Sequence, residues 1–142
     1  MRIAKTTERK FFSPDDPDKS WVMIKHLLPG ETQDIFDKAF SHKIEYEKNE
    51  KGKMEPKVSQ KPNNKLHREL TLQAVVTNWG EFYDKKSNKM KCTPANIVKA
   101  SREIEGFDEF IDGNRETLAD DIAQENKEQL KNLKGSASVP AK

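Results

Sequence analysis

The stretch from Leu66 to Trp79 (LHRELTLQAVVTNW) constrains the fold most, because it is the densest apolar segment of a very polar chain. Apolar residues recur along it at helical spacing, which predicts a central helix from about Lys65 to Asn78. More than half of the circumference of this helix is apolar, so we expect other elements to cover it on two sides. The apolar positions are Leu66, Leu70, Leu72, Ala74, Val75, Val76 and Trp79.

The rest of the chain supplies little more apolar surface. Only 33% of the 142 residues are hydrophobic, whereas roughly 45 to 50% is usual, and 35% are charged, against roughly 25%. The length fits one domain, and its core must be small. We therefore expect a flexible N-terminal arm over residues 1–12, a single domain over 13–134 and a disordered tail over 135–142. Such a fold either carries solvated appendages or is completed by burial against a partner.

Charge and cysteine content exclude several classes of protein. The chain has 26 Lys and Arg against 24 Asp and Glu, whereas a dedicated nucleic-acid binder concentrates positive charge on one face. Cys92 is the single cysteine, so an intramolecular disulfide cannot form. The N-terminus lacks an apolar signal region, and no segment reaches the about 18 apolar residues of a membrane span. These features predict a protein of the reducing cytoplasm that does not engage a membrane.

Three elements are predicted before the central helix. Trp21 to Leu28 is a short apolar run that ends at Pro29-Gly30, which predicts a strand. From Glu31 to Phe40 apolar residues recur at i,i+4, which predicts an amphipathic helix packed on the central helix. Between residues 42 and 64 sparse apolar residues alternate with charges around Asn49-Glu50-Lys51-Gly52, which predicts a β-hairpin with free edges.

Two further elements follow the central helix. Thr93-Pro94 is a helix start, with Thr as the cap and Pro at the first helical position. From Phe107 onward apolar residues again have helical spacing, with Gly113-Asn114 as a candidate break. Beyond Ile122 so few apolar positions remain that the helix should project, fray or pack on another chain. The fold class predicted is α+β and mainly α, with three to four helices around one small core. Its predicted core residues are Trp21, Ile24, Phe36, Phe40, Leu70, Val75, Trp79 and Ile97.

No group of residues in the sequence predicts catalysis, a metal site or a cofactor. The soft metal ligands His26, His42, His67 and Cys92 occur singly, without the spacing of a zinc site. A Cys92 nucleophile lacks a local signature, and a buried small apolar residue is its default role. Glycine-rich phosphate loops are absent from the sequence. We therefore expect a protein that is not an enzyme; stoichiometric zinc after mild purification would overturn that expectation.

Several short motifs carry a resemblance to a known family. They are Trp-Val-x-Ile at Trp21 to Ile24, a polar helix after Pro-Gly-Glu at Pro29 to Phe40, Val-Val-x-Asn-Trp at Val75 to Trp79, and Thr-Pro-x-Asn-Ile at Thr93 to Ile97. In this order, over residues 13–112, they resemble the small proteins of tail gene modules in tailed bacteriophages and prophages, usually called tail assembly chaperones. The resemblance implies a non-enzymatic protein that binds the tape-measure protein and helps recruit tail-tube subunits in the host bacterial cytoplasm.

Two departures from the family leave alternatives open. The turn between Trp79 and Thr93 is richer in lysine than in the family, and the long charged C-terminus has no fixed counterpart there. A minor structural virion protein of the tail or connector is one alternative. A nucleic-acid-associated accessory protein is another, and it would use the Lys85–Lys91 loop through Lys85, Lys86, Lys89 and Lys91, with an affinity that falls steeply with salt.

The residues themselves predict where a protein partner, or a second copy of the chain, would bind. A polar hairpin with free edges and a sparsely apolar terminal helix are surfaces that a partner completes. The predicted contact residues are Ile44, Tyr46, Met54, Val58, Leu118, Ile122, Leu130 and Leu133.

Overall fold

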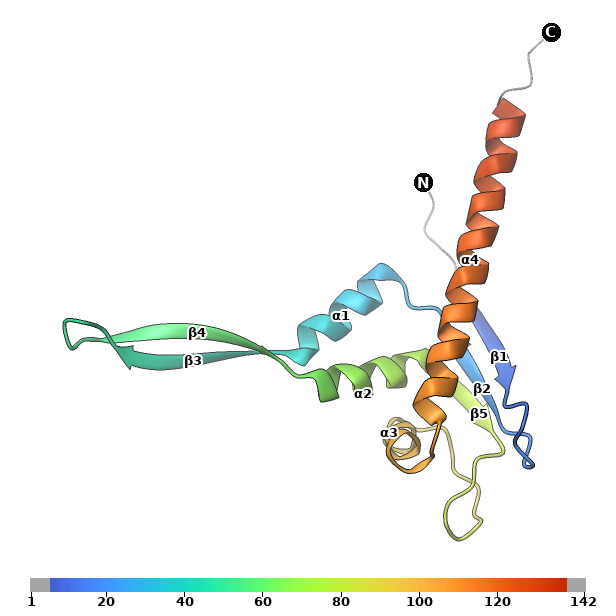
Figure 1. Cartoon of the computed structure of the whole chain (residues 1–142), viewed down its shortest axis with the longest axis horizontal. Helices are drawn as coiled ribbons and strands as arrows, with labels where there is room; N and C mark the ends of the chain where they lie inside the picture. The colour runs from blue at the N-terminus through green and yellow to red at the C-terminus, as the bar shows by residue number, and fades with distance from the viewer. Residues whose placement is uncertain (1–5, 138–142) are drawn as a thin grey trace.

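The chain forms four helices, a three-stranded sheet and a two-stranded sheet in the part that the structure describes (Figure 1). The structure is a computed structural model. It describes the backbone of residues 6–137, and the side chains of that range except 41–45, 57–61 and 132–137. The α+β fold class predicted from the sequence is confirmed.

The three-stranded sheet is antiparallel, with the order β1 (Glu8–Phe12), β2 (Trp21–Lys25), β5 (Val76–Gly80). The strand predicted from Trp21 is thus confirmed and ends at Lys25. The flexible arm predicted over residues 1–12 is wrong for Glu8–Phe12, since these residues pair in register with β2 and Phe11 packs on the core. Residues 1–5 of that arm lie outside the described range.

The central helix is shorter than predicted and turns into a strand. Helix α2 spans Asn64–Val75, and its first turn is capped by Asn63, whose Oδ1 accepts a hydrogen bond from the Leu66 N–H at 3.0 Å. Val76 already belongs to β5, which pairs with β2. The β-branched residues at this junction favour the extended backbone, and pairing with β2 satisfies backbone groups that a longer helix would have bonded internally. The prediction of helix up to Asn78 is therefore wrong.

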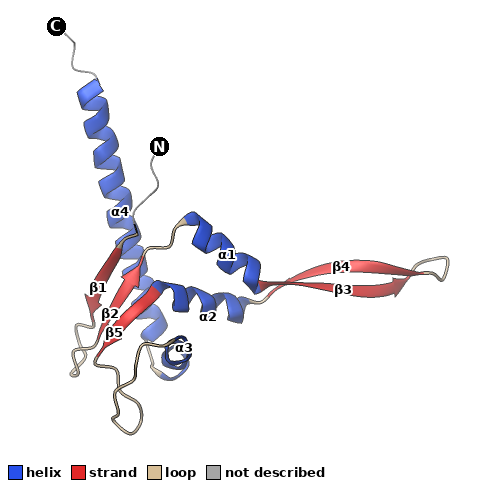
Figure 2. Ribbon diagram, turned by 180° about the vertical axis from the view of Figure 1, so that it is seen from behind, coloured by secondary structure: helices blue, strands red, loops and turns tan. Residues whose placement is uncertain are grey.

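The core lies between the three-stranded sheet and the helices α2, α3 (Pro94–Glu103) and α4 (Phe107–Ala137). Helix α4 runs across one face of the sheet, as the two opposite views show (Figures 1 and 2). Of the predicted core residues, Ile24, Val75, Trp79 and Ile97 are buried, whereas Trp21, Phe40 and Leu70 are half-buried and Phe36 is 45% exposed. The core is completed by Val22, Leu72, Val76, Phe82, Ala100, Phe107, Ile111 and Leu118.

The predicted start of α3 is confirmed, whereas the predicted break in the last helix is wrong. Thr93 caps α3 as predicted, because its Oγ1 accepts a hydrogen bond from the Asn96 N–H at 3.2 Å. Helix α4 passes through Gly113-Asn114 without the predicted break. A glycine inside a helix costs only about 1 kcal/mol, and burial of Ile111 before it and Leu118 after it on the core holds both sides together. Of the predicted tail, residues up to Ala137 are helical and Ser138–Lys142 lie outside the described range.

Gly80 lies where a side chain would overlap an indole ring. It is opposite Trp21 in the β2–β5 pairing, and a Cβ built on it would be 2.2 Å from Trp21 Nε1. Gly80→Ala should therefore displace the indole and lower the free energy of unfolding by about 1–3 kcal/mol, measured by urea denaturation. Gly113→Ala is the matched control, because its Cβ meets nothing within 4 Å and a helical alanine is favoured. Equal stability of the two variants would contradict this account.

Glu31 stabilises the start of α1 (Pro29–Ala39), the helix that leads into the hairpin. Its Oε1 accepts a hydrogen bond from the Leu28 N–H at 3.1 Å, and its Oε2 pairs with the Lys25 ammonium. The hydrogen bond from Lys25, followed by that from Leu28, lowers the pKa of Glu31 from its ordinary value. The stabilisation is then present above the pKa of the unfolded state and is lost as the pH falls through the lower pKa of the folded state.

Glu31→Gln should therefore cost stability at neutral pH and little in acid. We expect a loss of about 0.5–1 kcal/mol at pH 7, typical of a helix cap with a partly exposed ion pair. The difference from the wild type should shrink below about pH 4, measured by urea denaturation across that range. A difference that is constant with pH would show that the Glu31 carboxylate has no such role.

Candidate partner-binding surfaces

The most prominent feature of the molecule is a hairpin that extends away from the core (Figure 1). Strands β3 (Phe40–Lys48) and β4 (Met54–Pro62) pair along their full length, and we call them the hairpin arm. The arm continues α1 and precedes α2, which pack on each other as predicted. Nine residues of strand span roughly 30 Å. The hairpin predicted between residues 42 and 64 is confirmed as an element.

The tip of the hairpin arm is closed by hydrogen bonds from Asn49. Its Oδ1 accepts from the N–H groups of Lys51 and Lys53 at 3.0 and 2.9 Å. Gly52 follows with φ +75°, a conformation that glycine adopts without strain. The turn signal in the sequence therefore positions the reversal correctly, and it sets the pairing register of the two strands.

Two of the predicted contact residues are exposed on the hairpin arm. Tyr46 pairs with Pro56 and Met54 with Lys48, and their side chains are 65% and 58% exposed. Ile44 and Val58 pair with each other in the same register, and their side chains lie outside the described part of the structure. By the two-residue alternation of strands, all four positions belong to one face of the hairpin. At Tyr46 and Met54 this face is apolar, and the rest of the chain does not cover it.

The base of the hairpin arm contains a second apolar feature, which the sequence did not predict. The rings of Phe36 and Phe40 lie in contact, with centroids 4.2 Å apart, beside a cavity of about 230 Å³. Pro62 and His67 line the same cavity from the other side of the arm. Phe36 was predicted to be core because it pairs with Phe40 at i,i+4. The i,i+4 spacing correctly indicated that the two rings are neighbours. The prediction of Phe36 as a core residue is wrong, because its side of α1 is exposed to solvent.

The terminal helix divides into a packed half and a projecting half. Leu118 is 1% exposed and packs within the core, so its prediction as a contact residue is wrong, because α4 lies on the sheet at this point. Ile122 is half-buried against the same core. Residues 123–131 are all exposed, with Leu130 at 59%, and the side chain of Leu133 lies outside the described range. The projection predicted beyond Ile122 is confirmed, and Leu130 is the described apolar residue that it presents.

The lysine-rich loop is an ordered turn whose charge is partly compensated. Asp84 Oδ1 accepts hydrogen bonds from the N–H groups of Lys86 and Asn88, both at 2.9 Å. The ammonium groups of Lys85 and Lys89 lie 3.9 and 3.4 Å from the carboxylates of Glu103 and Glu81. Two of the four lysines that the nucleic-acid alternative would use thus face acids of their own chain.

The side chains considered as metal ligands or nucleophile do not assemble in the described part of the chain. No group of three or more His, Cys, Asp or Glu residues gathers there to hold a metal ion, and the His42 side chain lies outside it. Burial raises the pKa of the Cys92 thiol, whereas an activated cysteine nucleophile has a lowered pKa. No helix within residues 6–137 combines the length and apolar character needed to cross a membrane.

Comparison of the chain with protein-family models, with curated proteins and with solved structures found no match.

Proposed function

We propose that the protein is a non-enzymatic assembly factor of tailed phages or prophages, a tail assembly chaperone that binds the tape-measure or tail-tube protein in the host cytoplasm. One of the four motifs that carry this resemblance falls on α1, and the other three fall on β2, on the junction of α2 with β5, and on the start of α3. These three elements meet in one core. Three of the four motifs therefore lie in a single packed unit, which supports the proposal.

The hairpin arm is the observation on which the proposal depends most. A two-stranded hairpin is marginally stable in water by itself, and its outer edges offer unpaired backbone groups to another chain. The arm also presents Tyr46 and Met54 to solvent. A partner that adds a strand to an edge, or that covers the apolar face, would stabilise the arm and be recognised by it. The projecting half of α4, with Leu130, is the second surface proposed for contact. A second copy of the chain is an alternative partner for both surfaces.

A pull-down tests the proposal. The tagged full chain is expressed with its neighbouring genes, captured at about 0.3 M salt to screen surface charge, and the bound proteins are identified by mass spectrometry. We expect a long helical tape-measure-like protein or a tail-tube subunit to be retained, because burial of apolar surface is insensitive to salt at this level. Capture of nucleic acid alone, and only at low salt, would contradict the proposal in favour of the Lys85–Lys91 loop.

A minor structural virion protein is the second candidate function. The observation that favours it is the long charged C-terminal helix, which departs from the family and projects from the core. The two functions differ in the fate of the protein. A chaperone leaves before the particle is complete, so mass spectrometry of purified particles should not detect this chain, whereas a virion component would be present in stoichiometric amount.

A further inference from the structure

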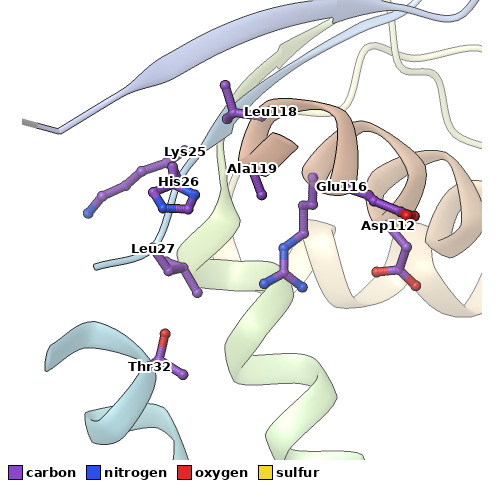
Figure 3. Close-up of a pocket in the computed structure, with 9 residues that line it drawn as sticks. Lys25, His26, Leu27, Thr32, Asp112, Glu116, Leu118 and Ala119 are labelled. Carbon is purple, nitrogen blue, oxygen red and sulfur yellow. The ribbon is translucent and has the colours of Figure 1, made fainter. Parts of the chain in front are cut away.

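A cavity of about 480 Å³ lies between the end of β2, the first turns of α1 and the packed half of α4. Figure 3 shows Lys25, His26 and Thr32 on one side of it and residues of α4, including Asp112, Glu116 and Ala119, on the other. Arg115 also lines this cavity, which we call the Arg115 pocket. It is separate from the hairpin arm and from the projecting half of α4.

Arg115 is the unusual residue of this pocket. Its side chain is half-buried, and burial lowers the pKa of its guanidinium from the ordinary value, although an arginine stays charged at neutral pH. Within the part of the chain that the structure describes, no hydrogen bond or ion pair is made by this guanidinium. A cation that is partly removed from water and lacks an acceptor is costly for the free protein.

The neighbouring charges do not supply that acceptor. Asp112 lies one helical turn before Arg115, but its two oxygens accept hydrogen bonds from Arg68 at 2.8 and 3.0 Å. The Lys25 ammonium pairs with Glu31. Glu116 is the next residue along α4, and residues at i and i+1 of a helix do not face each other. The position one turn after Arg115 is Ala119, which carries no acceptor. Asp112 attracts the Arg115 charge through space, but among the described residues the Arg115 guanidinium has no hydrogen-bond acceptor.

The chemistry around this cation selects a carboxylate on an apolar stem. The planar guanidinium matches a carboxylate in a bidentate arrangement, and a ligand carboxylate would supply the acceptor that the described part of the chain does not. The carboxylates of Asp112 and Glu116 also line the pocket and repel a phosphate dianion more strongly than a carboxylate, which carries a single negative charge. Leu27 and Leu118 line the same space and offer apolar surface to an aliphatic group.

We propose that the Arg115 pocket binds a carboxylate carried on an aliphatic stem, as on an acidic side chain or the chain end of a polypeptide partner. The guanidinium of Arg115 accepts the charge, and Thr32 and His26 offer further polar contacts. The site itself goes beyond the proposed function; only the choice of a polypeptide as the source of the carboxylate rests on that function.

A titration of the ¹⁵N-labelled full chain with small probes tests the site without any phage protein, so its failure is distinct from failure of the proposed function. N-acetylleucine should produce a saturable shift of the Arg115 Nε–H signal and of the Leu27 and Thr32 amide signals in NMR spectra. N-acetylleucinamide, which has the same shape without the charge, should not. Absence of a saturable shift with N-acetylleucine would overturn the proposal, and tighter binding of inorganic phosphate would overturn the assignment to a carboxylate.

Variants separate binding from folding. Arg115→Met keeps the apolar stem and should reduce N-acetylleucine affinity at least tenfold without lowering the melting temperature, because the charge that it removes had no acceptor. Ala119→Glu places a carboxylate one turn from Arg115 and should also abolish binding, while raising the melting temperature. Arg102→Gln is the control, since Arg102 is exposed and pairs with Glu69 at 2.8 Å, and its affinity should be unchanged. Unchanged affinity of Arg115→Met, or loss of affinity in Arg102→Gln, would contradict the site.

Discussion

Trp79→Ala should lower the free energy of unfolding by about 3–5 kcal/mol, the usual cost of deleting a large buried aromatic side chain. Trp79 is 6% exposed, stacks on Phe82 at 4.3 Å between ring centroids, and meets the edge of Phe107 at 6.3 Å. Its Nε1 also donates a hydrogen bond to the Met90 carbonyl at 2.8 Å. The substitution thus removes core packing and one of the hydrogen bonds that hold the end of the lysine-rich loop on the core.

Trp21→Ala is the matched comparison for that loss. Trp21 has the same side chain in the same sheet, but it is half-buried on the outer face, where the Lys10 ammonium lies 4.0 Å from the centre of its ring. Urea denaturation followed by circular dichroism should show a clearly smaller loss for Trp21→Ala. Equal losses would mean that the core does not lie on the Trp79 side of the sheet.

Replacing Tyr46 and Met54 together by serine should weaken binding of the proposed tail partner at least tenfold and leave stability unchanged. Both side chains are exposed on the hairpin arm, so the folded core loses little when they are shortened, whereas an interface loses apolar anchors of the kind that dominate binding energy. Affinity is measured by calorimetry with the partner retained in the pull-down, and stability by thermal unfolding.

Phe12→Ser controls for the loss of any exposed aromatic group. Phe12 is as exposed as Met54 but lies at the end of β1, on the sheet and away from the hairpin arm. Its replacement should leave affinity unchanged. If the Phe12 variant loses as much affinity as the Tyr46–Met54 variant, the arm is not the specific contact surface.

The elements that the sequence predicted are those with strong local signals at their ends. Pro29 is the first residue of α1, Thr93-Pro94 starts α3, and Asn49 with Gly52 closes the hairpin arm. In each case a single residue type satisfies or forbids a backbone hydrogen bond, so the boundary does not depend on distant parts of the chain.

The elements that the sequence missed depend on partners far along the chain. Val76 to Gly80 follows a helical run without a turn signal, and only β2, more than 50 residues earlier, makes it a strand. Strand β1 likewise exists because it pairs with β2. A short apolar run fits a buried helix or a strand equally well, and tertiary pairing decides between them.

The candidate surfaces also divide into features set by the local sequence and features set by distant parts of the chain. The exposure of Tyr46, Met54 and Leu130 follows from the local polarity of their segments. The burial of Leu118 does not, because the sequence cannot tell how far α4 remains on the sheet. The Arg115 pocket could not be predicted either. In the sequence Arg115 is one charge in a mixed run, and only the fold places the end of β2 and the start of α1 beside it.

Amide hydrogen exchange of the free protein, and of its complex with the proposed tail partner, tests the central claim most directly. Our account predicts fast exchange along β3 and β4 in the free chain, because a two-stranded ladder opens readily, and strong protection of the same amides in the complex. The core amides of β2 and α2 should be protected in both. A complex in which protection appears in the Lys85–Lys91 loop while the hairpin arm still exchanges fast would contradict it.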